Sequence, residues 1–221
     1  LFKSGGKINF KEMVPEERRM LNMFTYSVLE KAYPDLNFDL VTELKSSPTM
    51  LAEFIELLEY NYSKIDFIDK KIDLGFKCPL DLHCTYTRDQ ILLAMDHIDP
   101  SNVREGVKWI QDKQTDIFFI TLNKSDKDYS PSTMYKDYSI NESLFHWQSQ
   151  STTGSDSNTG QRYINHRSLG SKIMLFVREH KRNSFGTEPY TFLGTANYVS
   201  HEGSKPMNIM WKLDEPIPAK Y

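Results

Sequence analysis

Residues 123–166 interleave aromatic rings with amide, hydroxyl and carboxylate side chains. A buried amide or hydroxyl needs a hydrogen-bond partner, so this mixture is costly in an ordinary hydrophobic core. It suits a pocket that stacks against a planar ring and reads the ring's hydrogen-bonding edge. The alternative is a set of aromatic strands packed on a polar-rimmed sheet. The side chains concerned include Asn123, Lys124, Ser125, Tyr129, Ser130, Ser132, Thr133, Met134, Tyr135, Asp137, Tyr138, Phe145, His146, Trp147, Gln148, Gln150, Ser151, Thr152 and Thr153.

Positive charge gathers toward the end of this stretch and just beyond it. Residues 161–182 hold six basic side chains against Glu179 alone, although the whole chain has a formal net charge of -3. Such a cluster creates a local field that attracts anions. The same residues could equally form a solvated strand-and-loop face. They are Arg162, Arg167, Lys172, Arg178, Lys181 and Arg182.

Cys78, His83 and Cys84 lie close together in the sequence but lack the spacing of a structural zinc site. Four ligands, usually in two short-spaced pairs, hold such an ion. His83 and Cys84 are adjacent, so on a strand they would point to opposite faces, and no second pair follows. We expect no bound metal and no catalytic residues of this type.

Two patterns in the N-terminal part resemble nucleotide or nuclease chemistry. Residues 4–7 (SGGK) contain a Gly-Lys pair but lack the GxxxxGK[ST] loop that cradles phosphates. Asp35, followed by Glu43 and Lys45, superficially matches an arrangement in which two carboxylates hold Mg²⁺ and a lysine assists the attacking water. This would require Asp35 and Glu43 to converge, whereas both fall in a short acidic connector between two expected helices. Cleavage through these three residues stays an alternative.

The composition is that of a globular protein. The chain has 221 residues, of which 39% are hydrophobic and 26% charged, and this excludes collagen, coiled coil and global disorder. No apolar run approaches the ~18 residues of a membrane span, and nothing resembles a signal peptide. Two cysteines cannot form a disulfide framework. We expect a cytoplasmic protein without membrane contact and, because it begins at Leu1, a part of a longer polypeptide.

Helix signals dominate the first part of the chain. Pro15 stands where a helix begins, and a stripe of apolar residues follows until Pro34. Ser47 as the cap and Pro48 at the first helical position mark a second helix. These signals predict a small helical subdomain.

From Pro79 onward the pattern changes to strand-length segments. A short strand is expected at residues 80–84, and Thr87 with Gln90 forms a capping box that begins a helix. A further helix is expected from residue 159 or 160 to about 166. Strands are expected at residues 107–110, 116–122, 143–150, 172–178, 190–199 and 206–213. The expected fold class is α+β, with a curved, barrel-like sheet and flanking helices after the helical subdomain.

Several motifs carry a resemblance to a known family. They are residues 121–125 (TLNKS), 129–135 (YSPSTMY), 144–151 (LFHWQSQS), 159–166 (TGQRYINH) and 198–203 (YVSHEG). These motifs resemble the C-terminal module of SauUSI-type modification-dependent (type IV) restriction enzymes, which also contain a phospholipase-D-type nuclease and a superfamily 2 helicase. The match covers residues 79–221, and residues 1–78 resemble the helical coupler of that family more weakly.

The resemblance implies a target-recognition domain that has no catalytic activity of its own. Its implied fold is an SRA/PUA-like barrel at residues 79–221, and its implied partner is double-stranded DNA with 5-methylcytosine or 5-hydroxymethylcytosine. The modified base would be flipped into an aromatic pocket, in the service of phage defence. Nuclease and helicase domains would lie upstream, and ATP and Mg²⁺ would act there, with no cofactor in this part. A homodimer is left open.

Physical logic then assigns roles to residues. A flipped cytosine needs flat faces to replace its lost stacking and an acceptor for its N4 amine, for which a carboxylate is suited. The expected base pocket is Tyr135, Asp137, Tyr138, Phe145, Trp147, Gln148 and Gln150. The expected contacts to the DNA backbone are Asn123, Lys124, Ser130, Thr133, Gln161, Arg162, His166, Arg167 and Lys172. The competing hypothesis is a dimerisation or coupling module of a helicase-nuclease that binds no DNA and keeps the aromatic residues as core.

Overall fold

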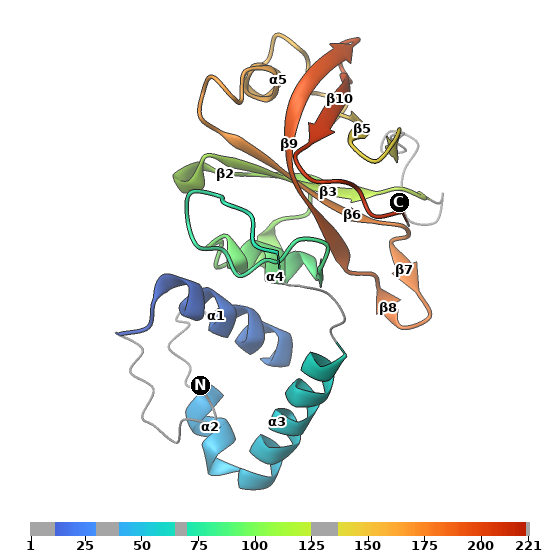
Figure 1. Cartoon of the computed structure of the whole chain (residues 1–221). Helices are drawn as coiled ribbons and strands as arrows, with labels where there is room; N and C mark the ends of the chain where they lie inside the picture. Colours follow the sequence, from blue (N-terminus) through green and yellow to red (C-terminus); the bar gives the residue numbers. More distant parts are fainter. Residues whose placement is uncertain (1–11, 30–39, 65–69, 125–136, 220–221) are drawn as a thin grey trace.

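A curved sheet flanked by two short helices follows three N-terminal helices in the computed structural model, which describes residues 12–29, 40–64, 70–124 and 137–219 (Figure 1). The helices are α1 (Pro15–Leu29), α2 (Leu40–Ser46), α3 (Pro48–Ser63), α4 (Arg88–Ala94) and α5 (Asn158–Ile164). The strands are β1 (Thr85–Tyr86), β2 (Val107–Ile110), β3 (Thr115–Thr121), β4 (Tyr138–Ser139), β5 (Leu144–Gln148), β6 (Lys172–Arg178), β7 (Arg182–Asn183), β8 (Gly186–Thr187), β9 (Tyr190–Glu202) and β10 (Asn208–Leu213). The predicted α+β class is confirmed.

Helix α1 joins the N-terminal helices to the sheet. It packs against α4 and lies between α4 and the α2–α3 pair in Figure 1. Arg19 on its buried face forms a bidentate ion pair with Asp96, at 2.8 and 2.9 Å, and also donates to the carbonyl of Lys77 at 2.6 Å. Phe24 meets Phe54 of α3 edge-on, with ring centroids 6.0 Å apart. The domain boundary after residue 78 stays a prediction.

Both predicted N-terminal helices are present, and the first turn of α3 differs in detail from expectation. Helix α3 begins at Pro48 as predicted, whereas the side chain of Ser47 makes no capping hydrogen bond.

The capping box of α4 is complete, because the Gln90 N–H donates to Thr87 Oγ1 and the Thr87 N–H donates to Gln90 Oε1.

The strand predicted at residues 80–84 is wrong. Leu80 and Leu82 are buried, as an alternating pattern requires, but His83 has φ 63°. A left-handed residue interrupts an extended chain, so regular pairing is delayed to β1.

The main sheet is mostly antiparallel, in the order β2-β3-β6-β9-β10-β5-β4, with β1 also on β9. One pair, β3 and β6, is parallel, and its register places Thr115 opposite Lys172 at one end and Thr121 opposite Arg178 at the other. Side chains on the two faces of this pair enter different hydrophobic clusters. Phe119 and Phe176 pack on the α4 side, whereas Phe118 packs with residues of β5, β10 and α5.

Two bulges in β9 bend the sheet. The pairing of β9 skips Leu193 opposite β6 and Val199 opposite β10, and an extra residue of this kind bends and twists a strand. Gly194 follows the first bulge with φ 97°, and a Cβ atom there would lie 3.0 Å from Ile72 Cδ1. The expected curvature is thus produced at two defined positions of one long strand.

Candidate functional site

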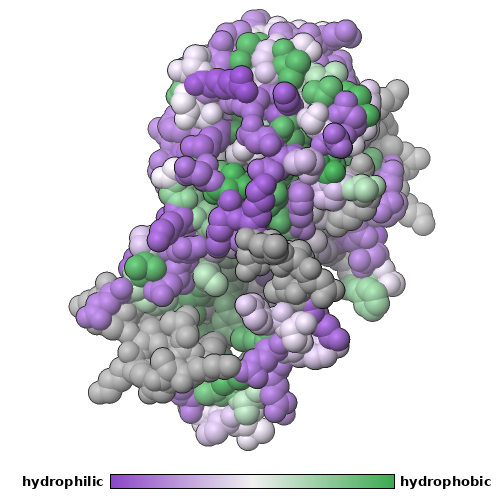
Figure 2. All heavy atoms as spheres, viewed as in Figure 1, coloured by the Kyte–Doolittle hydropathy of each residue, from purple (hydrophilic) through white to green (hydrophobic). Residues whose placement is uncertain are grey.

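A pocket of about 800 Å³ opens where the parallel pair β3–β6 ends. Thr121 and Arg178 line it at the ends of the two strands, together with residues of α4, β5 and β9. Figure 2 shows hydrophilic side chains over much of the face of the molecule turned to the viewer, with apolar residues scattered among them. The pocket is lined by Thr87, Arg88, Asp89, Arg104, Glu105, Gly106, Val107, Phe119, Thr121, Lys124, Asp137, Trp147, Gln148, Gln150, Arg178, Lys181, Thr187, Glu188 and Tyr190.

One wall combines two aromatic rings with two guanidinium groups. Phe119 and Tyr190 meet edge-on, with centroids 5.4 Å apart. Arg88 lies over the Phe119 ring at 4.5 Å, and Arg178 lies over the Tyr190 ring at 4.3 Å. Cation–π contacts of this kind hold a guanidinium group in place without neutralising its charge.

Arg178 is the most unusual residue of this wall. It is only 6% exposed, donates from Nε to Thr121 Oγ1 at 2.9 Å and donates from NH1 to the carbonyl of Glu188 at 3.0 Å. Among the residues that the structure describes, no carboxylate lies within 4.0 Å of its guanidinium group. A buried cation without an ionic partner is costly, so the wall is suited to an anionic ligand.

Another part of the lining carries a buried carboxylate. Asp137 Oδ2 accepts from Lys124 Nζ at 2.6 Å, and Oδ1 accepts from the backbone N–H of Gln148 at 2.9 Å. Burial raises the pKa of Asp137 above its ordinary value, and the Lys124 cation and the Gln148 N–H act in the opposite direction. Each oxygen of the Asp137 carboxylate can accept a second hydrogen bond, so this carboxylate can still accept one from a ligand.

Four residues of the expected base pocket line this cavity, namely Asp137, Trp147, Gln148 and Gln150. Trp147 also stacks on Phe118, with centroids 4.1 Å apart, so most of its ring belongs to the core. The Gln148 amide donates to Asn208 Oδ1 at 3.0 Å.

Two other expected pocket residues, Tyr138 and Phe145, do not line the cavity. Tyr138 is 49% exposed and stacks on His146, with centroids 4.7 Å apart. Phe145 is fully buried in the core. Tyr135 lies outside the described residues.

The residues expected to contact the DNA backbone include some at each end of the sheet. Lys124 lines the pocket, and the Asn123 amide donates to Glu179 at 3.5 Å. Arg162 forms a bidentate ion pair with the buried Asp116 near the start of β3, and Lys172 begins β6. Six residue steps along a strand are about 20 Å, which separates these cations from the pocket.

The remaining expected contacts lie around α5 or outside the described residues. The Gln161 amide donates to the carbonyl of Ser155, and Arg167 Nε donates to Asn197 Oδ1. His166 is buried, with Nδ1 3.3 Å from the carbonyl of Ser171 and Nε2 accepting from the Tyr198 N–H. Ser130 and Thr133 lie outside the described residues. Their roles in DNA binding stay predictions.

Sequence reasoning missed the aromatic–guanidinium wall. Phe119 and Tyr190 occur in apolar strands and give no signal that separates them from core residues. Arg88 follows a capping residue, and Arg178 ends a strand, positions at which a charged residue is ordinary. A buried arginine is unusual, but burial emerges only from the fold.

Within the described part of the chain, the other chemical patterns do not assemble into a site. Glu43 and Lys45 lie on α2, and Asp35 is outside the described residues. Cys78 is a buried free thiol, and burial raises its pKa to about 11. No three His, Cys, Asp or Glu side chains of the described ranges gather as metal ligands would. None of the described helices is long and apolar enough to cross a membrane.

The fold and the pocket define an α+β domain with a polar, aromatic-walled cavity at one end of a curved, mostly antiparallel sheet. Residues 80–221 match the family described as "Domain of unknown function (DUF3427)", and the chain belongs to this family. No curated protein matches the sequence. Among solved structures, the chain is similar to the "DNA recognition domain of the cytosine modification-dependent restriction endonuclease LpnPI", at 10% identity and a TM-score of 0.38 over 60% of this chain and 70% of that chain.

Proposed function

We propose that the pocket receives a modified cytosine extruded from double-stranded DNA, and that the domain recognises targets without cleaving them. The observation that carries the proposal is the composition of the cavity. It joins aromatic walls, a buried carboxylate and a buried arginine that lacks a carboxylate partner among the described residues. Its volume of about 800 Å³ is within the range of small-molecule sites.

Each wall offers a contact that a nucleotide could use. Asp137 can accept from the N4 amine of cytosine, a pairing that carboxylates make in DNA recognition. Phe119, Trp147 and Tyr190 supply apolar ring surface for the base. Arg88 and Arg178 supply positive charge for a phosphate of the same nucleotide, since arginine suits phosphate recognition.

The motif resemblance narrows the target to 5-methylcytosine or 5-hydroxymethylcytosine, in a SauUSI-type modification-dependent restriction enzyme. In that setting helicase and nuclease domains elsewhere in the polypeptide would use ATP and Mg²⁺, and this domain would direct them. The methyl group adds an apolar contact, which in a shaped pocket discriminates by about 10- to 200-fold.

The test is fluorescence anisotropy with matched duplexes that carry cytosine, 5-methylcytosine or 5-hydroxymethylcytosine at one position. We expect tighter binding to at least one modified duplex by about 10-fold or more, with affinity falling as salt rises because phosphate contacts release counterions. Equal affinities for all three duplexes would contradict the proposal.

A coupling or dimerisation module is the second candidate, and the surface of α3 favours it. This helix buries none of its residues, and it exposes Met50, Leu57, Leu58 and Tyr62. If this candidate is right, light scattering should show self-association, and the protein should have no affinity for any of the three duplexes.

A further inference from the structure

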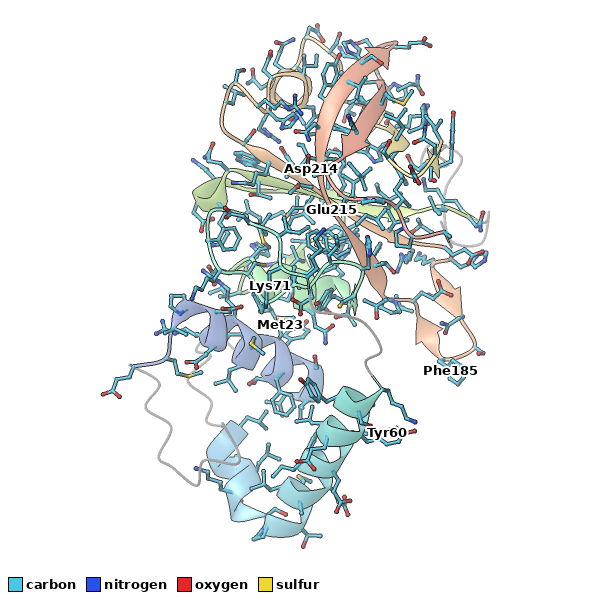
Figure 3. The ribbon with its side chains drawn as sticks, viewed as in Figure 1. Met23, Tyr60, Lys71, Phe185, Asp214 and Glu215 are labelled. Carbon is cyan, nitrogen blue, oxygen red and sulfur yellow. The ribbon has the colours of Figure 1, made fainter. Side chains whose placement is uncertain are left out.

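A short hairpin beside the pocket presents an aromatic ring to solvent. Strands β7 and β8 pair through Arg182 with Thr187 and Asn183 with Gly186, which leaves Ser184 and Phe185 as the tip. Phe185 is 97% exposed, the highest value among the exposed large hydrophobic residues of the described ranges. Figure 3 shows it at the end of the hairpin, directed away from the body of the domain.

The tip has a defined local structure. The Phe185 N–H donates to Asn183 Oδ1 at 2.8 Å, and the Glu188 N–H donates to the carbonyl of Lys181 at 3.1 Å. Gly186 follows with φ 124°, a conformation that glycine adopts without steric cost. The chain therefore holds the ring at the tip of a turn, where it gains nothing from burial in this structure.

Both arms of the hairpin return to the wall of the pocket. Lys181 on one arm and Thr187 on the other line the cavity. Phe185 is two residues from Thr187, and two extended residues span at most about 7 Å. Because successive phosphates of one strand lie about 3.4 Å apart along the helix axis, the ring is within about two base steps of a nucleotide at the pocket rim.

The charge on the arm next to the tip favours a polyanion as the partner. Lys181 and Arg182 lie on this arm, whereas Glu179 and Glu188 lie at the base of the hairpin, where Glu188 accepts from the His180 N–H. Two cations close to an aromatic tip match a polyanion with stacking bases better than an apolar protein groove. A two-stranded ribbon fits the major groove of DNA, and apolar side chains that enter between base steps unstack and kink the duplex.

We propose that Phe185 is a wedge that inserts between base pairs next to the nucleotide that enters the pocket. The inference rests on the proposed function, because it places the wedge beside an extruded base. The ring would replace stacking that the extruded base gives up, and so favour the opened duplex.

The experiment compares Phe185→Ala, Phe185→Trp and the wild-type protein by anisotropy on the modified and plain duplexes. We expect Phe185→Ala to weaken binding to the modified duplex by roughly 5- to 100-fold, as for loss of one base–aromatic stack, and to leave the plain duplex nearly unchanged. Leu169→Ala removes another exposed apolar residue, 58% exposed, and should leave both affinities unchanged. Thermal unfolding should be the same for all, because neither side chain is buried.

A spectroscopic readout separates stacking from a loose surface contact. Phe185→Trp should retain affinity, and its fluorescence should be quenched by the modified duplex beyond the change in the three native tryptophans, which the wild-type protein measures. Wild-type affinity of Phe185→Ala for the modified duplex, an equal loss on both duplexes, or an unquenched Trp would overturn the wedge. If the wild-type protein itself fails to prefer modified DNA, the proposed function fails instead, and the two outcomes are distinguishable.

Discussion

At the scale of single residues, Arg178 distinguishes this cavity from an ordinary hydrophobic pocket. Its guanidinium group is held by a threonine hydroxyl, a carbonyl and an aromatic ring, all of them neutral. A ligand phosphate would supply the missing negative charge, and charge-assisted hydrogen bonds of this type are about twice as strong as neutral ones.

Arg178→Met should therefore lower DNA affinity without unfolding the protein. Loss of hydrogen bonds to a charged group costs about 1.5–3 kcal/mol, which corresponds to about 10- to 150-fold in the dissociation constant. Loss of the donor to Thr121 Oγ1 and the Glu188 carbonyl costs about 1–3 kcal/mol, and removal of a buried charge without an ionic partner offsets part of this cost, so thermal unfolding checks that the variant stays folded.

Arg182→Met is the matched control for Arg178→Met, because Arg182 is exposed on the hairpin and does not line the pocket. It should remove about one phosphate contact and flatten the salt dependence by about one counterion. If Arg178→Met bound the modified duplex like the wild-type protein, the pocket would not hold the anionic part of the ligand.

His166 permits a second prediction at this scale. Burial lowers the pKa of His166 below its ordinary value of 6.5, so the unfolded chain binds a proton more readily than the folded one. This contribution to stability is present above pH 6.5 and is lost as pH falls through 6.5 toward the lower folded pKa, by at most about 1.4 kcal/mol per pH unit.

We expect the wild-type protein to lose more stability between pH 7.5 and 5.5 than His166→Gln, which keeps an acceptor for the Tyr198 N–H but does not titrate. Urea unfolding at several pH values measures the free energy of unfolding. The slopes of this free energy against pH are compared, since the variant can differ from the wild-type protein in absolute stability. Leu169→Ala, at an exposed position without a titratable group, should follow the wild-type slope. Parallel slopes for wild type and His166→Gln would contradict the assignment.

At the scale of elements, local sequence signals predicted the helices well, whereas the long-range pairing of strands could not be predicted from the sequence. Pro15, Pro48 and the Thr87–Gln90 capping box each mark a helix that the structure contains. The strand expected at residues 80–84 failed because His83 adopts a left-handed conformation, which no alternation of apolar residues reveals. The parallel pairing of β3 with β6 depends on contacts between residues more than 50 positions apart, and no local pattern encodes it.

The same pairing explains why the basic cluster at residues 161–182 indicated the position of the pocket for only some of its residues. Residues 161–182 are continuous in sequence, but β6 runs between Lys172 and Arg178 and carries them to opposite ends of the sheet. Arg162 is used in an ion pair with Asp116, whereas Lys181 and Arg178 reach the pocket. Charge counted along the chain therefore overstated the size of any one surface.

At the scale of the whole molecule, the candidate site is where the curved sheet brings two layers together. Phe119 belongs to the cluster under α4, and Trp147 belongs to the cluster under α5, yet both reach the same cavity. The motif-rich stretch of sequence supplied one wall of the pocket. The other wall comes from α4 and β9, whose residues look like ordinary structural positions until the chain is folded.

The central claim is that this cavity reads an extruded modified cytosine, and Asp137→Asn tests it most directly. An amide keeps one acceptor oxygen, which the Gln148 N–H already uses, and places an NH₂ donor at the other position, so the N4 amine loses an acceptor and the opened state should lose its advantage. The double variant Lys124→Gln/Asp137→Asn removes both charges of the buried pair and guards against unfolding caused by a lysine that has lost its Asp137 partner. Thermal unfolding checks both variants. The control is Arg167→Ala, whose side chain bonds to Asn197 away from the pocket.

The quantity to measure is the ratio of the dissociation constants for plain and modified duplexes. We predict that this ratio, about 10 or more for the wild-type protein, falls toward one in the folded Asp137 variants and stays at the wild-type value in Arg167→Ala. Folded Asp137 variants that discriminate modified from plain cytosine as the wild-type protein does would contradict the account.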